Sequence, residues 1–138
     1  MAGIVLISHG NLAAEMLCTL EMIMGPQRAI RAVGMQPGEG EDSLEERIAA
    51  AVSRVDDGMG VLLFVDLFGG SPFNACLRLI SSSQIFIPVD IITGMNLPMI
   101  MEACVYSRGR SLPQLVGMVK RGARRGIRVY SDLKVENV

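Results

Sequence analysis

His9 is the only histidine in this 138-residue sequence, and it stands where a short apolar run gives way to a turn containing glycine. Two other groups of residues complement it: the carboxylate of Asp66, which also follows an apolar run, and Gly-Gly-Ser at residues 69–71. An imidazole that is held through one ring nitrogen keeps a nucleophilic lone pair on the other. A helix N-terminus with glycines and a hydroxyl can stabilise phosphoryl oxygens. Together these residue types suit the transient attachment of a phosphoryl group to histidine.

Each of these residues also has a simpler explanation. A lone histidine is usually an ordinary surface or core residue, Asp66 could cap a turn, and Ser71 could be a plain helix N-cap. We interpret Asp66 as functional because the run before it is wholly apolar. For Ser71 the cap and a phosphate contact can hold together. Gly94 and Asn96, in a third loop of similar design, could border the same crevice.

The sequence lacks what other phosphoryl chemistries need. It has no Walker A lysine and no carboxylate cluster for Mg²⁺, which argues against nucleotide-driven transfer. It has neither the second histidine nor the basic clamps of a phosphohistidine phosphatase, and Ser71 lies in no G-x-S-x-G motif. We therefore expect no metal and no cofactor. A carrier that accepts a phosphoryl group and hands it on is favoured.

Secondary structure must bring these residues together. The short apolar runs Ile4–Ile7 and Gly60–Asp66 are typical of buried parallel strands, and helical patterns alternate with the strands. We therefore predict a single α/β domain over residues 1–138, with a doubly wound, mainly parallel sheet and helices on both faces. Loops at the carboxyl ends of such strands share one rim, which would unite His9, Asp66 and Ser71.

Capping and turn signals predict the boundaries of the other elements. Ser43 and Glu46 form a capping box for one helix, and Ser71 as N-cap with Pro72 in the first helical position opens the next. The remaining strands are predicted at 28–35, 85–92 and 127–130, and the helices at 12–24, 44–55, 75–80, from the 93–98 loop to about 106, and 112–124. Residues 132–138 are expected to be loose.

Charge and hydropathy narrow the class of protein. The net charge is −1, and the basic residues at 120–128 have no interleaved aromatics, so they predict a solvated helix end and no nucleic-acid binding. No apolar run approaches the ~20 residues of a membrane span, and no leader pattern precedes the first strand, so we expect a cytoplasmic protein.

Apolar content and cysteine usage add two expectations. Half of the residues are hydrophobic, and the helix at 12–24 has few polar positions, so we expect a homo-oligomer that covers part of this surface. Cys18, Cys76 and Cys104 are predicted to be small buried residues in a reducing compartment, and to form neither disulfides nor metal sites.

Three segments resemble one known family. IVLISHGNLAAEML, GVLLFVDLFGGSPFNACLRL and ITGMNLPMIMEA are similar to the IIA component of the mannose family of the bacterial phosphoenolpyruvate-dependent sugar phosphotransferase system. The resemblance covers most of the chain in order and spacing, and DLFGGSPFN is a highly specific block. It implies that His9 becomes a tele-phosphohistidine, that Asp66 orients the imidazole, and that Ser71, Gly70 and Gly10 contact the phosphoryl group.

The resemblance also implies partners and assembly. The phosphoryl group would come from the histidine phosphocarrier protein, pass to a IIB component, and reach the sugar at the membrane IIC/IID permease. The family fold is a homodimer in which a C-terminal strand is exchanged, which would assign residues 127–130 to the partner's sheet. Because the sequence ends after the IIA part, we expect IIB to be a separate protein. Asn11-Leu12 stands where some relatives carry an aromatic residue, which affects partner contacts.

Two other functions share this chemistry. The phosphotransfer subunit of a dihydroxyacetone kinase of the same system would use the phosphohistidine on a different final acceptor. A regulatory module would have its phosphorylation state sensed by a partner. The block from Phe68 to Pro72 favours sugar transport, and neighbouring genes would separate the three.

Overall fold

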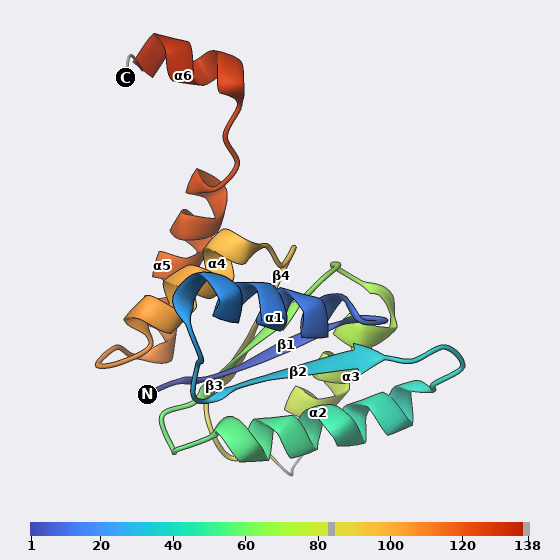
Figure 1. Cartoon of the computed structure of the whole chain (residues 1–138). Coiled ribbons are helices and arrows are strands. Elements are labelled where there is room, and N and C mark those ends of the chain that lie inside the picture. The colour runs from blue at the N-terminus through green and yellow to red at the C-terminus, as the bar shows by residue number, and fades with distance from the viewer. Residues whose placement is uncertain (83–84, 137–138) are drawn as a thin grey trace.

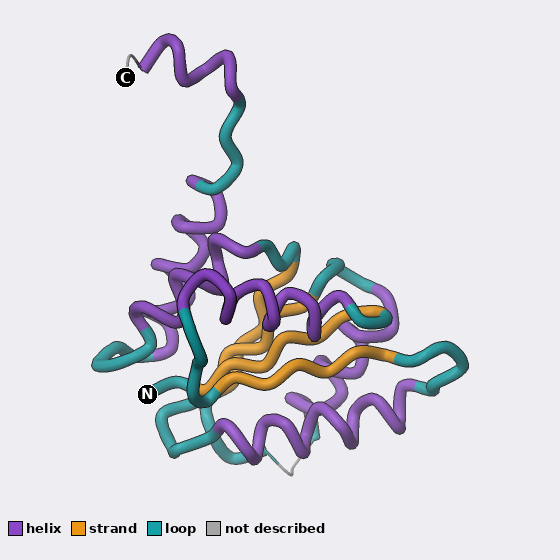
Figure 2. Tube along the Cα trace, in the orientation of Figure 1, coloured by secondary structure: helices purple, strands orange, loops and turns teal. Residues whose placement is uncertain are grey.

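The chain folds around a sheet of four parallel strands in the order β2-β1-β3-β4 (Figures 1 and 2). The computed structural model describes residues 1–82 and 85–136. The strands are β1 (Gly3–His9), β2 (Ile30–Met35), β3 (Val61–Val65) and β4 (Val89–Thr93). The helices are α1 (Leu12–Met24), α2 (Glu41–Val55), α3 (Gly70–Ser81), α4 (Leu97–Tyr106), α5 (Leu112–Arg125) and α6 (Tyr130–Glu136).

The two central strands are those with apolar sequences. Residues 3–8 of β1 and all of β3 are buried, as is usual for parallel strands that are covered on both faces. Their register places Ile4 beside Leu62 and Ile7 beside Val65. Because the strands run in the same direction, this register also brings their carboxyl ends to one edge of the sheet.

Helices cover both faces, as the alternation of patterns predicted. Helices α1, α4 and α5 lie on one face, over a core that includes Leu6 and Phe64, and α2 and α3 lie on the other, over a core that includes Ile7 and Val65 (Figure 1). Consecutive strand residues therefore serve opposite cores. Among the described residues, no helix has the length and apolar character to cross a membrane.

Two predicted boundaries are wrong for local reasons. Helix α2 begins at Glu41 behind Gly40, and Ser43 donates its hydroxyl proton to Glu39 at 2.7 Å, so it forms no capping box with Glu46. Strand β4 begins at Val89, where residue 85 was expected. Pro88 has no N–H for strand pairing, and pairing starts at its carbonyl oxygen, which accepts the N–H of Val61 at 2.9 Å.

The predicted strand at 127–130 does not form within the single chain. Residues 127–129 pair with no described strand, and Tyr130, the last residue of the predicted strand, instead begins α6, which continues to Glu136 through residues expected to be loose. Figure 1 shows α6 held away from the sheet, beyond the end of α5. A β-strand needs a neighbouring strand whose backbone groups accept and donate its hydrogen bonds. Residues 127–129 do not lie against a strand edge of their own sheet, so no strand forms there. Residues 137 and 138 of the expected tail lie outside the described residues.

The three cysteines differ in exposure. Cys76 is buried and Cys104 is half-buried, and burial raises the pKa of their thiols to about 12 and about 11. Cys18 is exposed, which corrects the prediction that all three are buried. Helix α1 buries Ala13 and Leu20 against the sheet, and Cys18 falls outside that stripe.

Candidate active site

His9 and Asp66 meet at a topological switch point. The chain crosses from β1 to β2 on one side, whereas β3 and β4 lie on the other side of β1. In open α/β sheets, ligands bind beyond the carboxyl ends of the two strands at such a point. His9 is the last residue of β1, and Asp66 directly follows β3. The structure thus brings together the two residues that the sequence placed on one rim.

One carboxylate oxygen of Asp66 holds both the backbone and the ring of His9. The backbone N–H of His9 donates to Oδ2 at 2.9 Å, and the ring Nδ1 lies 2.9 Å from the same oxygen. The Asp66 side chain is 12% exposed, against 44% for His9. The contact therefore lies on the protected side of the imidazole, and the rest of the ring reaches solvent.

This contact selects a tautomer. A carboxylate oxygen only accepts, so Nδ1 carries the proton, and in the neutral ring Nε2 then holds the lone pair. The other oxygen, Oδ1, is buried and has no hydrogen-bond partner among the described residues. Within this part of the chain, the Asp66 side chain therefore directs its hydrogen bonding at His9 alone. The result is a ring whose outward nitrogen is the nucleophilic one.

The N-terminus of α3 lies beside that nitrogen. Gly69 and Gly70 have φ values of 79° and 81°, and no side chain caps the helix. The N–H groups of an uncapped first turn can bind an anion. A Cβ added to Gly70 would lie 3.6 Å from Cε1 and 3.7 Å from Nε2 of His9. The absence of a side chain at Gly70 therefore leaves open the space next to His9 Nε2.

Ser71 is not the N-cap that the sequence predicted. Helix α3 begins at Gly70, so Ser71 is its second residue and Pro72 its third. Two consecutive glycines with positive φ turn the chain into the helix before the serine is reached. Ser71 is half-buried, and among the described residues its hydroxyl has no hydrogen-bond partner. It is uncommitted in the turn that faces His9.

Gly10 serves the turn after His9. Its φ is 56°, and its N–H donates to the carbonyl oxygen of Met35 on β2 at 2.8 Å. That N–H is therefore committed to the sheet, so it is not the donor for the phosphate contact predicted at Gly10. A Cβ on the neighbouring Gly34 would lie 1.9 Å from the carbonyl oxygen of Gly10. Gly34 thus allows the turn to lie flat on β2, a role that the sequence analysis missed.

Ser8 is a second residue that the sequence analysis missed. It is completely buried, and its Oγ accepts the backbone N–H of Ala13 at 2.8 Å. The same hydroxyl lies 3.4 Å from the carbonyl oxygen of Gly10. Ser8 thus connects the end of β1 with the first turn of α1 on either side of His9. The position of this serine directly before His9, at the end of an apolar strand, could have indicated a role in holding the turn.

The third loop does not contribute as expected. Asn96 accepts the N–H of Met99 at 3.0 Å as the N-cap of α4, and it donates to the carbonyl oxygen of Ala123 at 3.4 Å. Gly94 and Asn96 line a cavity beside β4 and α5, in which neither His9 nor Asp66 takes part. The Asn96 side chain is thus committed to capping α4 and joining it to α5.

Charge near the rim is compensated. Arg47 donates to the carbonyl oxygen of Gly34 and to Glu39, in each case at 2.9 Å. The backbone N–H of Gln36, followed by the Ser43 hydroxyl and Arg47, lowers the pKa of Glu39. Within residues 1–82 and 85–136, no group of three or more His, Cys, Asp or Glu side chains could hold a metal ion.

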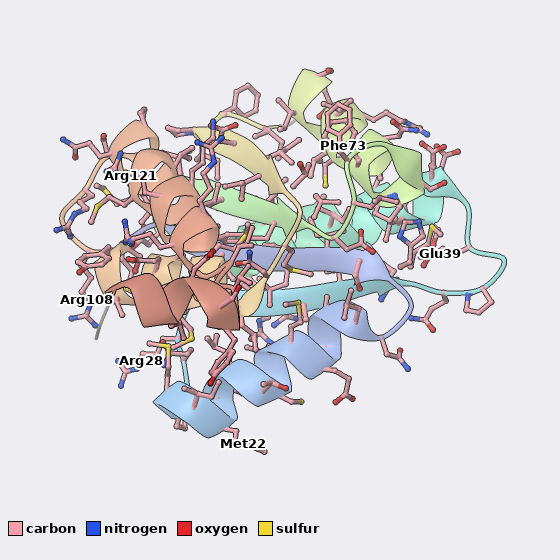
Figure 3. All side chains as sticks on the ribbon, turned by 90° about the horizontal axis from the view of Figure 1, so that it is seen from above. Met22, Arg28, Glu39, Phe73, Arg108 and Arg121 are labelled. Carbon is pink, nitrogen blue, oxygen red and sulfur yellow. The ribbon has the colours of Figure 1, made fainter. Side chains whose placement is uncertain are left out.

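Exposed apolar side chains lie in the turns that carry the site. Leu12 is 49% exposed at the start of α1, and Leu67 and Phe68 are 59% and 75% exposed directly after Asp66. The Phe68 ring lies 5.0 Å from that of Phe73 on α3, which is labelled in Figure 3. Exposed aromatic and aliphatic side chains that lie together are typical of a surface that docks protein.

Comparison with known proteins gives consistent results. A family model described as "PTS system fructose IIA component" (EIIA-man) matches residues 3–120. The mannose-specific EIIAB component of Escherichia coli K12 is 33% identical over 135 residues, which cover 97% of this chain and 41% of that protein. The chain thus spans less than half of that relative.

Two solved structures share the fold over nearly the whole chain. The EIIA component from Streptococcus agalactiae has a TM-score of 0.85 at 27% identity, and covers 96% of this chain and 99% of its own. The IIA protein associated with the fucose utilization operon of Streptococcus pneumoniae has a TM-score of 0.77 at 32% identity, with the same coverage.

Proposed function

The chain belongs to the EIIA-man family of phosphotransferase system IIA components, and on that premise we propose that it is a phosphoryl carrier in which His9 is transiently phosphorylated on Nε2. The observation that carries the proposal is the pairing of Nδ1 with Asp66 while Nε2 lies beside the uncapped N-terminus of α3. This arrangement supplies a nucleophile and an anion site at adjacent positions.

The reaction would be an in-line exchange between two histidines. The lone pair of His9 Nε2 attacks the phosphorus atom of the phosphohistidine on the histidine phosphocarrier protein. The P–N bond of the donor histidine breaks as the new P–N bond to His9 forms. The donor imidazole leaves with the electron pair of the broken bond. The proton on His9 Nδ1 stays in its hydrogen bond to Asp66, which stabilises the positive charge that develops on the ring.

The N-terminus of α3 would hold the phosphoryl oxygens. Its first-turn N–H groups and the uncommitted hydroxyl of Ser71 are hydrogen-bond donors, and the positive end of the helix dipole favours the dianion. Arg47, a nearby cation, is already paired with Glu39, so backbone N–H groups and one hydroxyl would do most of the holding. Such holding by neutral donors suits a group that must leave again, toward a IIB component and then the sugar at the IIC/IID permease.

The exposed side chains of Leu12, Leu67 and Phe68 support docking of these protein partners on the cytoplasmic side. The similar E. coli protein is mannose-specific and the similar S. pneumoniae protein is associated with a fucose utilization operon, which together support a sugar pathway without selecting the sugar. Service to a dihydroxyacetone kinase, or a purely regulatory role, would use the same His9 chemistry. Transfer assays with purified acceptors distinguish these three functions. In the proposed function, the phosphoryl group passes from His9 to a sugar-specific IIB component and not to a dihydroxyacetone kinase subunit.

We further propose that two copies form a homodimer by exchange of residues 127–130. Three features support this. Residues 127–129 form no strand in the sheet of their own chain, and Ile127 and Tyr130 are each 74% exposed. The edge of β4 pairs with no described strand. A cavity of about 450 Å³ beside β4 and α5 has the apolar lining residues Ile91, Ile92 and Val116, and Ile127 of the same chain also borders it. Light scattering tests this on the wild type and on a chain cut after Gly126. We expect a dimeric wild type and a monomeric truncated chain, and a monomeric wild type would contradict the proposal.

A direct experiment tests the carrier function. The protein is incubated with phosphoenolpyruvate, the general phosphotransferase enzyme and the histidine phosphocarrier, and its mass is measured. We expect one added phosphoryl group that is labile to acid, and none in His9→Ala. Acid-labile phosphorylation that persists in His9→Ala would show that His9 is not the phosphorylated residue.

A further inference from the structure

The end of the molecule that carries the loop after α4 is rich in arginine. Arg108 and Arg110 lie in this loop, and Arg121 lies on α5. Figure 3 shows Arg108 and Arg121 at one end of the molecule and Glu39 at the other. The loop after α4 lies at the amino end of β1, where the carbonyl oxygen of Ser107 accepts the N–H of Ala2 at 3.2 Å. The basic end is therefore opposite the His9 rim.

A groove of about 610 Å³ opens at this basic end, between α5 and the loop after α4. Among residues 1–82 and 85–136, its charged lining residues are Arg110 and Arg121, and none of these residues adds a carboxylate to the lining. Gln114 contributes a side-chain amide, while Gly109 and Gly117 leave the backbone open. The groove is within the size range of small-molecule sites, and its charged groups are hydrogen-bond donors only.

Arg110 is held in place without a carboxylate. Its guanidinium carbon lies 4.8 Å from the centre of the Tyr106 ring, and Nη1 donates to the carbonyl oxygens of Tyr106 and Arg108 at 3.5 and 3.4 Å. The residue is half-buried. A guanidinium that stacks on an aromatic ring and bonds to carbonyls loses little further freedom when it binds an anion. Arg110 is thus pre-organised and keeps its full charge.

Arg121 is also left uncompensated. The nearby carboxylate of Glu102 bonds to Arg125 at 2.9 Å, so it is already paired. Glu102 lies against α5 because Gly122 has no side chain, and a Cβ there would come within 2.2 Å of Glu102 Cγ. Among the described residues, neither Arg110 nor Arg121 forms an ion pair. Two guanidinium groups therefore border one groove, and no acidic side chain among the described residues lines it.

Gln114 has a side-chain amino group without a hydrogen-bond partner among the described residues. Its Oε1 accepts the backbone N–H of Ser111 at 3.0 Å, within the capping box of α5. The Nε2 group then adds two N–H donors to the same groove. Planar guanidinium groups bind the oxygens of a phosphate in pairs, which an ammonium group does not.

We propose that this groove binds the phosphate group of a phosphate ester, held by Arg110 and Arg121 with help from Gln114. The site is separate from His9 and lies at the opposite edge of the sheet, so its ligand and a protein docked on the His9 rim can be bound together. It would make the carrier responsive to a phosphorylated compound, either a soluble one or a phospholipid headgroup.

The test follows backbone and arginine side-chain N–H resonances by NMR as inorganic phosphate is added, against sodium chloride at equal ionic strength. We expect saturable shifts of Gly109, Gly117 and the Nε–H of Arg110 and Arg121. Arg110→Gln and Arg121→Gln should each weaken binding about tenfold, the effect of one charge-assisted hydrogen-bonded contact. Arg54→Gln, which removes an exposed cation of α2 outside the groove, should not change it.

Vesicles separate the two sources of the phosphate. The protein is sedimented with phosphatidylcholine vesicles that contain or lack phosphatidylglycerol. Binding to the anionic vesicles that is lost in the Arg110→Gln, Arg121→Gln double variant identifies a lipid headgroup, and phosphate shifts without vesicle binding identify a soluble ester. The proposal is overturned if phosphate shifts only residues around His9 and Gly70, or if the double variant responds like the wild type. His9→Ala is expected to leave the groove shifts intact, which separates this result from the fate of the carrier proposal.

Discussion

The Oδ2 atom of Asp66 accepts two hydrogen bonds from His9, one from the backbone N–H and one from Nδ1 of the ring, each at 2.9 Å. A residue after one strand thereby fixes both the main chain and the side chain of a residue that ends the adjacent strand. Because these strands are parallel neighbours, a rigid sheet sets the orientation of the ring. This contact underlies the first prediction.

Asp66→Ala is expected to slow phosphorylation of His9 roughly a hundredfold, because the ring loses its orientation and its preferred tautomer. The fold should survive, since Asp66 makes no other side-chain hydrogen bond among the described residues and its loss costs about 1 kcal/mol. Rapid-quench measurement of phosphoryl transfer gives the rate, and thermal unfolding checks the fold. Asp90→Ala on β4 is a matched control, because its carboxylate is exposed and bonds locally to the N–H of Ile91. A wild-type rate in Asp66→Ala would show that Asp66 is only a turn residue.

Gly70→Ala should impair phosphorylation more than stability. The added Cβ would lie 3.6 Å from His9 Cε1 and occupy the space beside Nε2, and the residue would also have to keep a φ of 81°. The backbone cost for a non-glycine residue is about 1–2 kcal/mol. Gly58→Ala has a comparable backbone cost at a φ of 95° with no atom within 4 Å of the new Cβ, so it isolates the effect of site blockage. Denaturant titration and transfer rates are compared for the two variants, and equal rates would contradict the proposed use of this space.

Ser8→Ala removes a buried hydroxyl that joins β1 to the first turn of α1. The N–H of Ala13 would then be buried without its partner, so we expect a loss of about 1–2 kcal/mol in the free energy of unfolding, together with slower phosphorylation. Ser81→Ala removes an exposed hydroxyl that bonds within its own helix, and should change neither quantity. Urea unfolding and the same transfer assay provide the readouts. Unchanged transfer in Ser8→Ala would mean that the turn holds His9 without Ser8.

The three thiols should react in an order set by exposure and thiolate content. Burial raises the pKa of Cys76 to about 12 and of Cys104 to about 11, so both stay protonated in the folded protein at pH 8–9. Exposed Cys18 is expected to be alkylated first by iodoacetamide, followed by Cys104 and then Cys76 after unfolding. Peptide mass mapping over time gives the order. Early modification of Cys76 would contradict its burial.

The same thiols predict how stability depends on pH. Above the ordinary thiol pKa of about 8.5, the unfolded chain loses protons that the folded chain keeps, so the free energy of unfolding should fall as pH rises through this value toward the raised folded values. Urea titrations at pH 7 and pH 10 measure the change. Cys76→Ala should reduce the slope, because one of the two shifted groups is then absent. A slope that is the same in Cys76→Ala and the wild type would rule out this origin.

The local sequence was sufficient to predict an element where all its residues indicate the same environment. The apolar run of β3 can only be buried, and burial on both faces implies a parallel strand between two helical layers. The position of Asp66 at the end of that strand followed directly. Prediction failed where two local signals competed. A serine and a following proline suggested the start of α3, but two glycines with positive φ begin the helix at Gly70.

The sequence by itself determined the α/β class, the strand ends that carry His9 and Asp66, and the family, because burial pattern, turn residues and a specific motif are local properties. Only the tertiary structure decided that one oxygen of Asp66 holds both the backbone and the ring of His9, that Gly34 makes room for the turn at Gly10, and that Arg110 and Arg121 share a groove. The first two relationships join residues that are far apart in the chain, and strand register sets them. The third depends on how the loop after α4 packs against α5, which the local pattern does not specify.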